Sequence, residues 1–201
     1  MGAAATAVAV FAFSRGETKQ LAVEADGALG GGSFDARLLA HVTRAIRERH
    51  GIEVDGGSKA GLRALVACQQ AKKVLSTVDD ARVDVENVAP DRDVSVEVSS
   101  AQLKEMAAAE LEVLKRLCAD ALMGAAAADA RCTKLHSVEL VGGGTRMPIV
   151  KEVVAEVLGD ALSYTLDSSH ATAMGAATII ARAEAVAVAS ARLAAAQAEA
   201  A

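Results

Sequence analysis

Two glycine triplets place the strongest constraint on how this chain can fold. They lie at 30–32, within "LGGGSF", and at 142–144, within "VGGGTRM", and each joins an apolar extended run to a helical pattern. Glycine loses more conformational entropy on folding than any other residue and offers no side chain to pack. Three in succession at two such junctions therefore indicate tight turns and a backbone that another group can approach.

Each junction predicts a place where an anion can bind. The first N–H groups of a helix lack intrahelical partners, and the helix dipole adds partial positive charge there. Glycines in front of the helix would let a phosphate or a sugar approach those donors. Neither triplet fits the Rossmann or the P-loop pattern. For one triplet alone a flexible turn is the simpler interpretation, but the repeated design favours a nucleotide site.

A helical segment between the triplets, "CQQAKKVLS", carries polar groups on one face. Their spacings of about three, four and seven residues bring them together on a helix. Two cations, an amide and a hydroxyl could hold the ribose and base of a nucleotide, although a solvated basic face is the alternative. The residues are Gln69, Lys72, Lys73 and Ser76.

Composition excludes several classes of function. The 201 residues are 52% hydrophobic and only 2% aromatic, so the core must be built from Ala, Val and Leu. A net charge of -5 argues against nucleic-acid binding. Cys68, Cys118 and Cys132 are odd in number and lack a CxxC motif, which predicts free thiols in a reducing compartment. The four histidines do not cluster with other ligands, so no side-chain metal site is predicted.

The termini predict neither a leader nor a membrane span. "MGAAATAVAVFAF" lacks a basic region and runs directly into charged residues, which disfavours a signal peptide. "MGAAAT" fits a myristoylation pattern that often matches by chance, so we expect no lipidation. Arg182, Glu184, Arg192 and Glu199 interrupt the Ala-rich C-terminus. We therefore expect a soluble, cytoplasmic protein, also compatible with the nucleus, that does not bind membranes.

Strand and helix patterns alternate along the chain. Strands are predicted at 8–13 and 19–25, a half-buried hairpin at 81–98 with its turn at 87–93, and short strands at "VELV" and "LSYTL". Helices are predicted from the first triplet to Gly51, from Ser58, from Ser99 as one long helix with a capping box, from Pro148 to Gly159, and after Ser168 or Ser169. The pattern predicts an α/β fold with mixed sheets in two packed subdomains.

Four segments in this order resemble the seventy-kilodalton heat-shock chaperone family, in particular its 110-kilodalton branch. They are "LGGGSFDARLLAHV", "ALVACQQAKKVLS", "VELVGGGTRMPIVKEV" and "TLDSSHATAMGAA", and the resemblance covers residues 1–182. It implies an actin-like (ribonuclease H-like) ATPase fold, of which this chain is similar to the second lobe only. The implied domains are an inner subdomain at 1–30 and 108–182, an outer subdomain at 31–107, and a helical or frayed tail at 183–201.

The resemblance also implies a site for ATP or ADP, with Mg²⁺ bound only through the nucleotide. The first triplet would approach the phosphates, the face of the 69–76 segment would hold the adenosine, and the second triplet with its arginine would close over the adenine and ribose. The implied residues are Gly30, Gly31, Gly32, Ser33, Gln69, Lys72, Lys73, Ser76, Gly142, Gly143, Gly144, Arg146 and Ser169.

Several positions depart from the family pattern. Gln69 replaces the usual glutamate, Gly144 a serine, Ser169 an aspartate and His170 a glutamate. The magnesium-ordering aspartate, the first phosphate loop, the catalytic lysine and the other lobe have no counterpart. Phosphoryl transfer depends on placing the metal, the γ-phosphate and water together. We therefore expect weak nucleotide binding, no catalytic residue and no hydrolysis by this chain alone.

Three hypotheses for the function follow. The chain is a fragment of a stress-response chaperone whose complete form binds ATP, holds unfolded clients through domains missing here, and acts with other chaperones or as their exchange factor. Alternatively, it is an interaction module that binds a chaperone or exchange factor without nucleotide. A third hypothesis, another actin-like ATPase such as a sugar kinase, is disfavoured because "GGGTRMP" followed by "MGAA" is much more similar to the chaperones.

Overall fold

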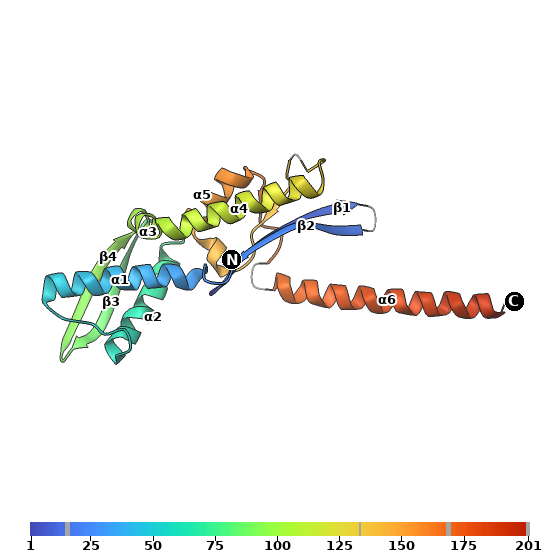
Figure 1. Ribbon diagram of the computed structural model, residues 1–201. Coiled ribbons are helices and arrows are strands. Elements are labelled where there is room, and N and C mark those ends of the chain that lie inside the picture. Colours follow the sequence, from blue (N-terminus) through green and yellow to red (C-terminus); the bar gives the residue numbers. More distant parts are fainter. Residues whose placement is uncertain (15–16, 133, 168–169, 200–201) are drawn as a thin grey trace.

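The computed structural model describes residues 1–14, 17–132, 134–167 and 170–199, with side chains described as far as Arg192. Helices and strands alternate in a mixed α/β arrangement (Figure 1). In chain order the elements are β1 (Thr6–Ser14), β2 (Glu17–Asp26), α1 (Gly31–His50), α2 (Lys59–Val74), β3 (Asp80–Ala89), β4 (Arg92–Ser99), α3 (Ser100–Met106), α4 (Ala108–Ala128), β5 (Val138–Glu139), the 3₁₀ turn η1 (Gly143–Arg146), α5 (Pro148–Leu158), β6 (Leu162–Ser163) and α6 (Ala171–Glu199).

The described strands form three two-stranded sheets. β1 and β2 are antiparallel, with a register shift between Val10 and Phe11. β3 and β4 form the second antiparallel pair, in which Val83 lies opposite Val96. β5 and β6 are parallel. The two predicted hairpins are therefore confirmed, whereas each described sheet is purely antiparallel or purely parallel and none is mixed.

Helix ends follow the local signals of the sequence. The Ser58 hydroxyl accepts a hydrogen bond from the Gly61 N–H and caps α2. Gly51 ends α1 in the left-handed conformation, with φ of 66°. Ser99 and Gln102 form the predicted capping box, and Pro148 occupies the first turn of α5.

Three expectations about the elements were wrong in detail, and a fourth is not tested. The long helix after Ser99 breaks at Ala107, which has φ of -99° and ψ of 17°, so it is divided into α3 and α4. The turn between β3 and β4 is shorter than 87–93, because β3 continues to Ala89. The strands at "VELV" and "LSYTL" have only two residues each. The predicted cap at Ser168 or Ser169 lies outside the described residues.

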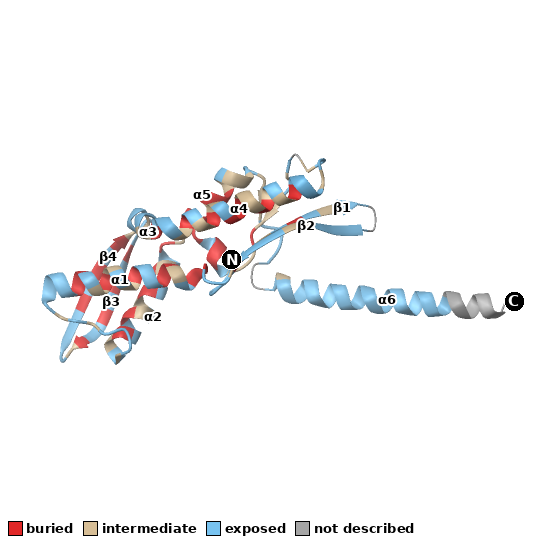
Figure 2. Ribbon diagram, in the orientation of Figure 1, coloured by how far each residue is buried: buried red, intermediate tan, exposed pale blue. Residues whose placement is uncertain are grey.

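The main core lies between α1, α2, α4, α5 and the β3–β4 hairpin (Figure 2). Its inner residues are small or aliphatic, with Phe34 fully buried among them. A second, much smaller cluster holds the β1–β2 hairpin against α4, through Val10, Ala121 and Ala125. The hairpin is thus fixed to the rest of the molecule mainly by alanine and valine contacts on one of its faces.

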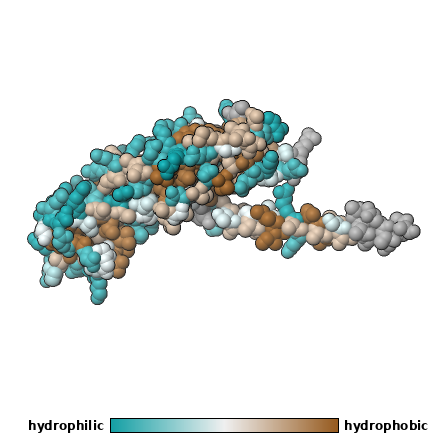
Figure 3. Space-filling view, in the orientation of Figure 1, coloured by the Kyte–Doolittle hydropathy of each residue, from teal (hydrophilic) through white to brown (hydrophobic). Residues whose placement is uncertain are grey.

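Helix α6 extends away from this body as one continuous helix (Figure 1). Its side chains are exposed from Thr172 to Arg192, and Figure 3 shows hydrophobic side chains on the part that stands clear of the body. Residues Ala171–Arg192 have a mean hydropathy of 1.3 and are long and apolar enough to span a membrane by length and composition. This corrects the expectation that charged residues exclude such a segment, although one such helix is weak evidence for membrane insertion.

Candidate functional site

The first glycine triplet forms a turn that is held by hydrogen bonds to a side chain before it, Asp26, and a side chain after it, Ser33. The Asp26 carboxylate accepts hydrogen bonds from the N–H groups of Ala28 and Leu29, at 2.7 and 2.9 Å. These bonds, that of Ala28 first, lower the pKa of Asp26. Gly30, in an extended conformation, then caps α1, and the Ser33 hydroxyl donates to its carbonyl oxygen at 2.7 Å.

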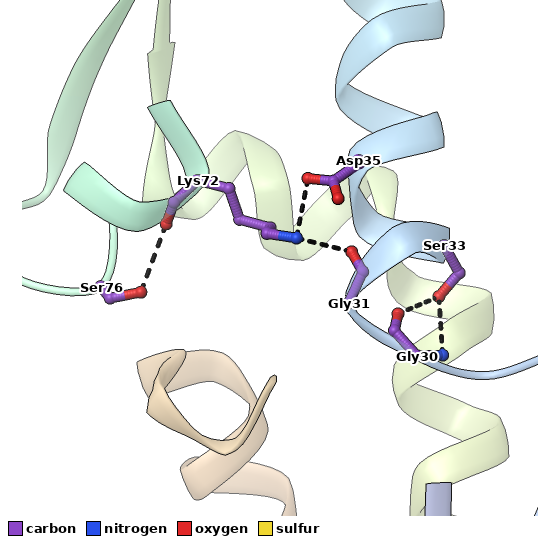
Figure 4. Close-up of polar contacts among 6 residues, drawn as sticks. All are labelled: Gly30, Gly31, Ser33, Asp35, Lys72 and Ser76. Carbon is purple, nitrogen blue, oxygen red and sulfur yellow. Dashed lines mark hydrogen bonds and ion pairs between the residues drawn. The ribbon is translucent and has the colours of Figure 1, made fainter. Parts of the chain in front are cut away.

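Lys72 connects this turn to α2 (Figure 4). Its Nζ atom donates to the Gly31 carbonyl oxygen at 2.7 Å and lies 2.7 Å from Asp35 Oδ1. Both side chains are largely buried, with 16% of Lys72 and 8% of Asp35 exposed. The approach to Oδ1 is an ion pair without hydrogen-bond geometry. Charge therefore holds this contact, and Lys72 fixes the start of α1 against α2.

The second glycine triplet enters a 3₁₀ turn that the sequence did not predict, and the predicted α-helix begins after it at Pro148. Gly142 has φ of 97°, and η1 comes before α5. The buried Thr145 closes the turn, because its hydroxyl donates to the Gly142 carbonyl oxygen at 2.8 Å. Gly143 is exposed, and a Cβ there would meet no atom within 4 Å.

The N-terminal segment, residues 1–4, contacts both glycine turns. The N–H groups of Gly31 and Gly32 donate to the carbonyl oxygens of Gly2 and Ala3, at 2.9 and 2.8 Å. The N–H of Gly144 donates to the Met1 carbonyl oxygen at 3.2 Å. The expectation of bare donors is therefore wrong at these three positions, because carbonyl oxygens of the chain itself already accept their hydrogen bonds.

This close approach explains why glycine is needed in both turns. A Cβ at Gly30 would lie 2.5 Å from the Ala3 carbonyl oxygen, and one at Gly142 would lie 2.3 Å from that of Met1. Real Cβ atoms essentially never come so close to backbone. Glycine is therefore required in both turns because the N-terminal segment lies so close to them. Met1 contacts the second turn, and the next two residues, Gly2 and Ala3, contact the first.

The remaining predicted residues differ in accessibility. Gln69 and Lys73 are exposed on α2, and Arg146 is exposed on η1. Ser76 is half-buried, and its hydroxyl donates to the Lys72 carbonyl oxygen at 3.3 Å. His170 lies 3.0 Å from the Asp167 carboxylate, measured from Nδ1. Ser169 lies outside the described residues.

Sequence reasoning missed one side chain and the backbone carbonyl groups of the N-terminal segment. Asp35 was part of a quoted motif but was not identified as the partner of Lys72, although it lies one turn after Gly31. The carbonyl groups of Gly2 and Ala3 carried no side-chain signal. Among the described residues, no cluster of three or more His, Cys, Asp or Glu side chains is suited to a metal ion.

The fold and these turns define a mixed α/β protein with two glycine turns joined by a lysine-anchored helix and an N-terminal segment. The Hsp70 protein family matches residues 1–189, so the chain belongs to that family. Membership implies an actin-like ATPase fold, with which the mixed α/β arrangement is consistent.

Curated relatives agree with this assignment. The chain is 35% identical to a heat shock protein homolog of Saccharomyces cerevisiae over 172 residues, which cover 86% of this chain and 24% of the relative. It is 33% identical to a 97 kDa heat shock protein of Mesocentrotus franciscanus, covering 85% and 19%. It is 30% identical to heat shock protein 88 of Dictyostelium discoideum, covering 88% and 22%. The chain therefore spans about a quarter or less of the length of these relatives.

Proposed function

We propose that this chain is the second lobe of an actin-like nucleotide-binding domain and that it binds adenine nucleotide weakly. One observation carries the proposal. Lys72 joins α2 to the carbonyl group of Gly31, so the exposed face of α2 and the first glycine turn are neighbours. Gln69 and Lys73 lie within one turn of Lys72 on α2 and are open to solvent. This arrangement suits a ribose and a base beside a phosphate-facing turn.

The residues fit one end of the nucleotide better than the other. Gln69, Lys73 and Arg146 offer exposed amide and cationic groups, and the open surroundings of Gly143 leave room for a planar base or a sugar. At the phosphate end, the N–H groups of Gly31 and Gly32 already donate to the chain's own carbonyl oxygens. We therefore assign the adenosine part to α2 and η1, and expect the phosphates to contribute little affinity.

The placement of the available polar groups at the adenosine end, away from the phosphates, argues against hydrolysis. Transfer of a phosphoryl group to water requires a metal ion, the γ-phosphate and the attacking water in fixed positions. Mg²⁺ would reach this chain only together with the nucleotide. The exposed groups Gln69, Lys73 and Arg146 can hold or orient the adenosine, but they do not move a proton at the phosphate. Phosphate release from ATP at the rate of the buffer blank is the expected result.

Titration calorimetry with ADP tests the proposal. We expect measurable heat that Lys73→Ala or Arg146→Ala reduces by about tenfold in affinity, the equivalent of about 1.4 kcal/mol. Lys59→Ala is a matched control, because Lys59 is an exposed lysine at the other end of the same helix. Equal loss of affinity in all three variants, or no heat with the wild-type chain, would refute a nucleotide site at this place.

We further propose that the chain belongs to a longer cytoplasmic or nuclear chaperone. Its relatives carry heat-shock names and are at least four times as long as the matched segment. In that longer protein, ATP binding would be coupled to protein folding, to holding unfolded clients or to nucleotide exchange on other chaperones. These functions need groups outside this chain. A test is whether the chain, joined to a first lobe of the family, gains ATP affinity that Lys73→Ala removes.

A second candidate function is a nucleotide-independent interaction module for a chaperone or exchange factor. The observation that favours it is the satisfied state of three backbone donors, those of Gly31, Gly32 and Gly144. Because these N–H groups already donate to carbonyl oxygens of the chain, no ligand is required to satisfy them. Under this hypothesis, calorimetry with ADP gives no heat while a purified seventy-kilodalton chaperone binds the chain equally well with and without ADP.

A further inference from the structure

The β1–β2 hairpin has one face that α4 covers and one face that nothing in the described structure covers. The inner face carries Val10, which packs on Ala121 and Ala125 of α4. Cross-strand partners share a face, so the register assigns four pairs to the outer face. These pairs are Ala7 with Ala25, Ala9 with Val23, Phe11 with Gln20, and Phe13 with Thr18.

None of these eight outer residues is charged, and six of them are apolar. The largest side chains are well exposed, with 78% of Phe13, 49% of Val23 and 45% of Phe11 accessible. The two phenylalanine rings lie 6.5 Å apart, measured between centroids. A strand that is apolar on both faces is typical of a sheet covered on both sides. A contiguous apolar surface of this kind marks an interaction site.

Helix α6 is the second uncovered apolar surface of the chain. Ile179 and Val186 lie seven residues apart, hence on one helical face, and are 72% and 65% exposed. Between residues 171 and 192, at 1.5 Å per residue, the helix is about 33 Å long, which matches the roughly 30 Å of a nine-residue strand. Over the described residues α6 makes no substantial contact with β1 or β2. The two surfaces are therefore free and similar in length.

The first turn of α6 is held by Asp167. The Ala171 N–H donates to the Asp167 carbonyl oxygen at 2.9 Å, and the His170 N–H donates to the Asp167 carboxylate, also at 2.9 Å. These bonds set the first turn, and the helix then extends away from the body, without substantial contact with the other described elements (Figure 1). Its apolar face is consequently available to another molecule.

We propose that α6 of one chain packs across the outer face of the β1–β2 hairpin of a second copy, and reciprocally. A two-fold axis makes the same two surfaces meet twice and closes the assembly as a dimer. Two strands about 4.8 Å apart and about 30 Å long present roughly 300 Å². Two such contacts, counted on both partners, bury roughly 1,200 Å², at the lower end of specific interfaces. The area therefore suffices for a dimer of moderate affinity.

Analytical ultracentrifugation of the full chain gives the first test. For a dimer of moderate affinity, the weight-average mass should rise from monomer to dimer between roughly 1 and 100 µM. Phe11→Ser with Phe13→Ser, and separately Ile179→Gln with Val186→Gln, should shift dimerisation to at least tenfold higher concentration. Leu62→Ser with Val66→Ser is the matched control, because both α2 residues are 55% exposed and lie on another surface.

Far-UV circular dichroism would establish that each variant is folded. A wild-type chain that is monomeric throughout the concentration range overturns the proposal. The same holds for a dimer that the α2 control weakens as much as the hairpin variant does.

Photo-cross-linking identifies the occupant directly. Benzoylphenylalanine at position 13 keeps an aromatic side chain at the exposed site, and mixing ¹⁴N- and ¹⁵N-labelled chains distinguishes the copies. The expected product joins position 13 of one isotope to an α6 peptide of the other. An adduct between position 13 and α6 of the same copy shows that the chain covers its own hairpin, and an adduct elsewhere shows a different interface. Either result overturns the proposal, as does capture by lipid vesicles of a chain that remains monomeric.

Discussion

At the scale of single residues, the pair formed by Lys72 and Asp35 carries the clearest energetic consequence. Removing one partner of a buried ion pair leaves an uncompensated charge and costs about 3 kcal/mol. Asp35 is only 8% exposed, so Lys72→Met should lower the free energy of unfolding by about that amount, measured by urea denaturation. Adding Asp35→Asn should restore much of the loss, because the neutral amide no longer needs a cation.

The neighbouring lysine supplies the control for this experiment. Lys73 is exposed, and exposed substitutions usually change stability by less than about 0.5 kcal/mol. If Lys72→Met and Lys73→Met had equal effects on unfolding, Lys72 would not hold the glycine turn in the way described.

The three thiols should differ in reactivity. Burial, and to a lesser extent the charge of Asp35, raises the pKa of Cys68 to about 12, and burial raises that of Cys118 to about 11. Cys132 is only half-buried. At pH 8 an aromatic disulfide reagent should therefore modify one thiol of the native chain quickly, and Cys132→Ser should remove this fast phase. Fast modification of two or three thiols in the native chain would contradict the burial.

The same raised pKa values set the pH dependence of stability. Above the ordinary thiol pKa of 9.0 the unfolded chain loses protons from Cys68 and Cys118, while the folded chain keeps them. The free energy of unfolding should therefore fall as the pH rises from about 9 toward 11. Cys68→Ala and Cys118→Ala together should reduce this slope.

The two glycine turns show how much of the candidate site can be predicted from single residues of the sequence. The sequence predicts that Gly30 and Gly142 need a closely approaching group, and the structure contains one at each position. It does not predict that the group at both is the N-terminal segment, because the bonds from Gly31 to Gly2 and from Gly144 to Met1 join backbone groups distant in sequence. Such contacts leave no side-chain pattern. Contact between these glycines and a nucleotide is still a prediction.

At the scale of helices and strands, local signals determine the ends of elements. Ser99 Oγ accepts the Gln102 N–H at 3.1 Å, and Gln102 Oε1 accepts the Ser99 N–H at 2.9 Å. Ser99→Ala should destabilise the fold by about 1 kcal/mol in thermal or urea unfolding, the usual loss for a helix cap. Ser100→Ala is the control, because the backbone bond from the Ser100 N–H to the Asp79 carbonyl oxygen is kept. Equal effects of the two substitutions would show that the capping box is not formed in solution.

Elements were predictable where a local rule governs them and not where packing does. Alternating valines predict β3 and β4, and Gly51 and Gly159 predict the ends of α1 and α5. The break at Ala107 has no such signal, since alanine is the best helix former. Ala107 is fully buried, and tertiary packing of α3 and α4 against the core is the physical reason for the break. The 3₁₀ turn η1 likewise has a tertiary contact that no local rule predicts, because the Gly144 N–H donates to the Met1 carbonyl oxygen.

At the scale of the whole molecule, the two clusters of buried residues divide the chain unequally. The β3–β4 hairpin turns six valines toward the main core, each at most 7% exposed: Val83, Val85, Val88, Val94, Val96 and Val98. Among its described residues, the β1–β2 hairpin has a single buried hydrophobic side chain, that of Val10 at 8%. Since buried apolar area supplies the main favourable term in folding, the second hairpin is much less firmly attached to the body.

Hydrogen exchange should report this difference. An isolated two-stranded hairpin is at best marginally stable, so β1–β2 depends on its contact with α4. At concentrations low enough for the chain to be monomeric, amides of β1 and β2 should exchange through local opening, while those of β3 and β4 exchange only near the free energy of global unfolding. Ala121→Gly, which removes a fully buried methyl group from the smaller cluster, should speed exchange in β1–β2 and leave β3–β4 slow relative to global unfolding. Equal protection of both hairpins would mean that the outer face of β1–β2 is covered even in the monomer, because the α4 contact alone is too small to provide that stability.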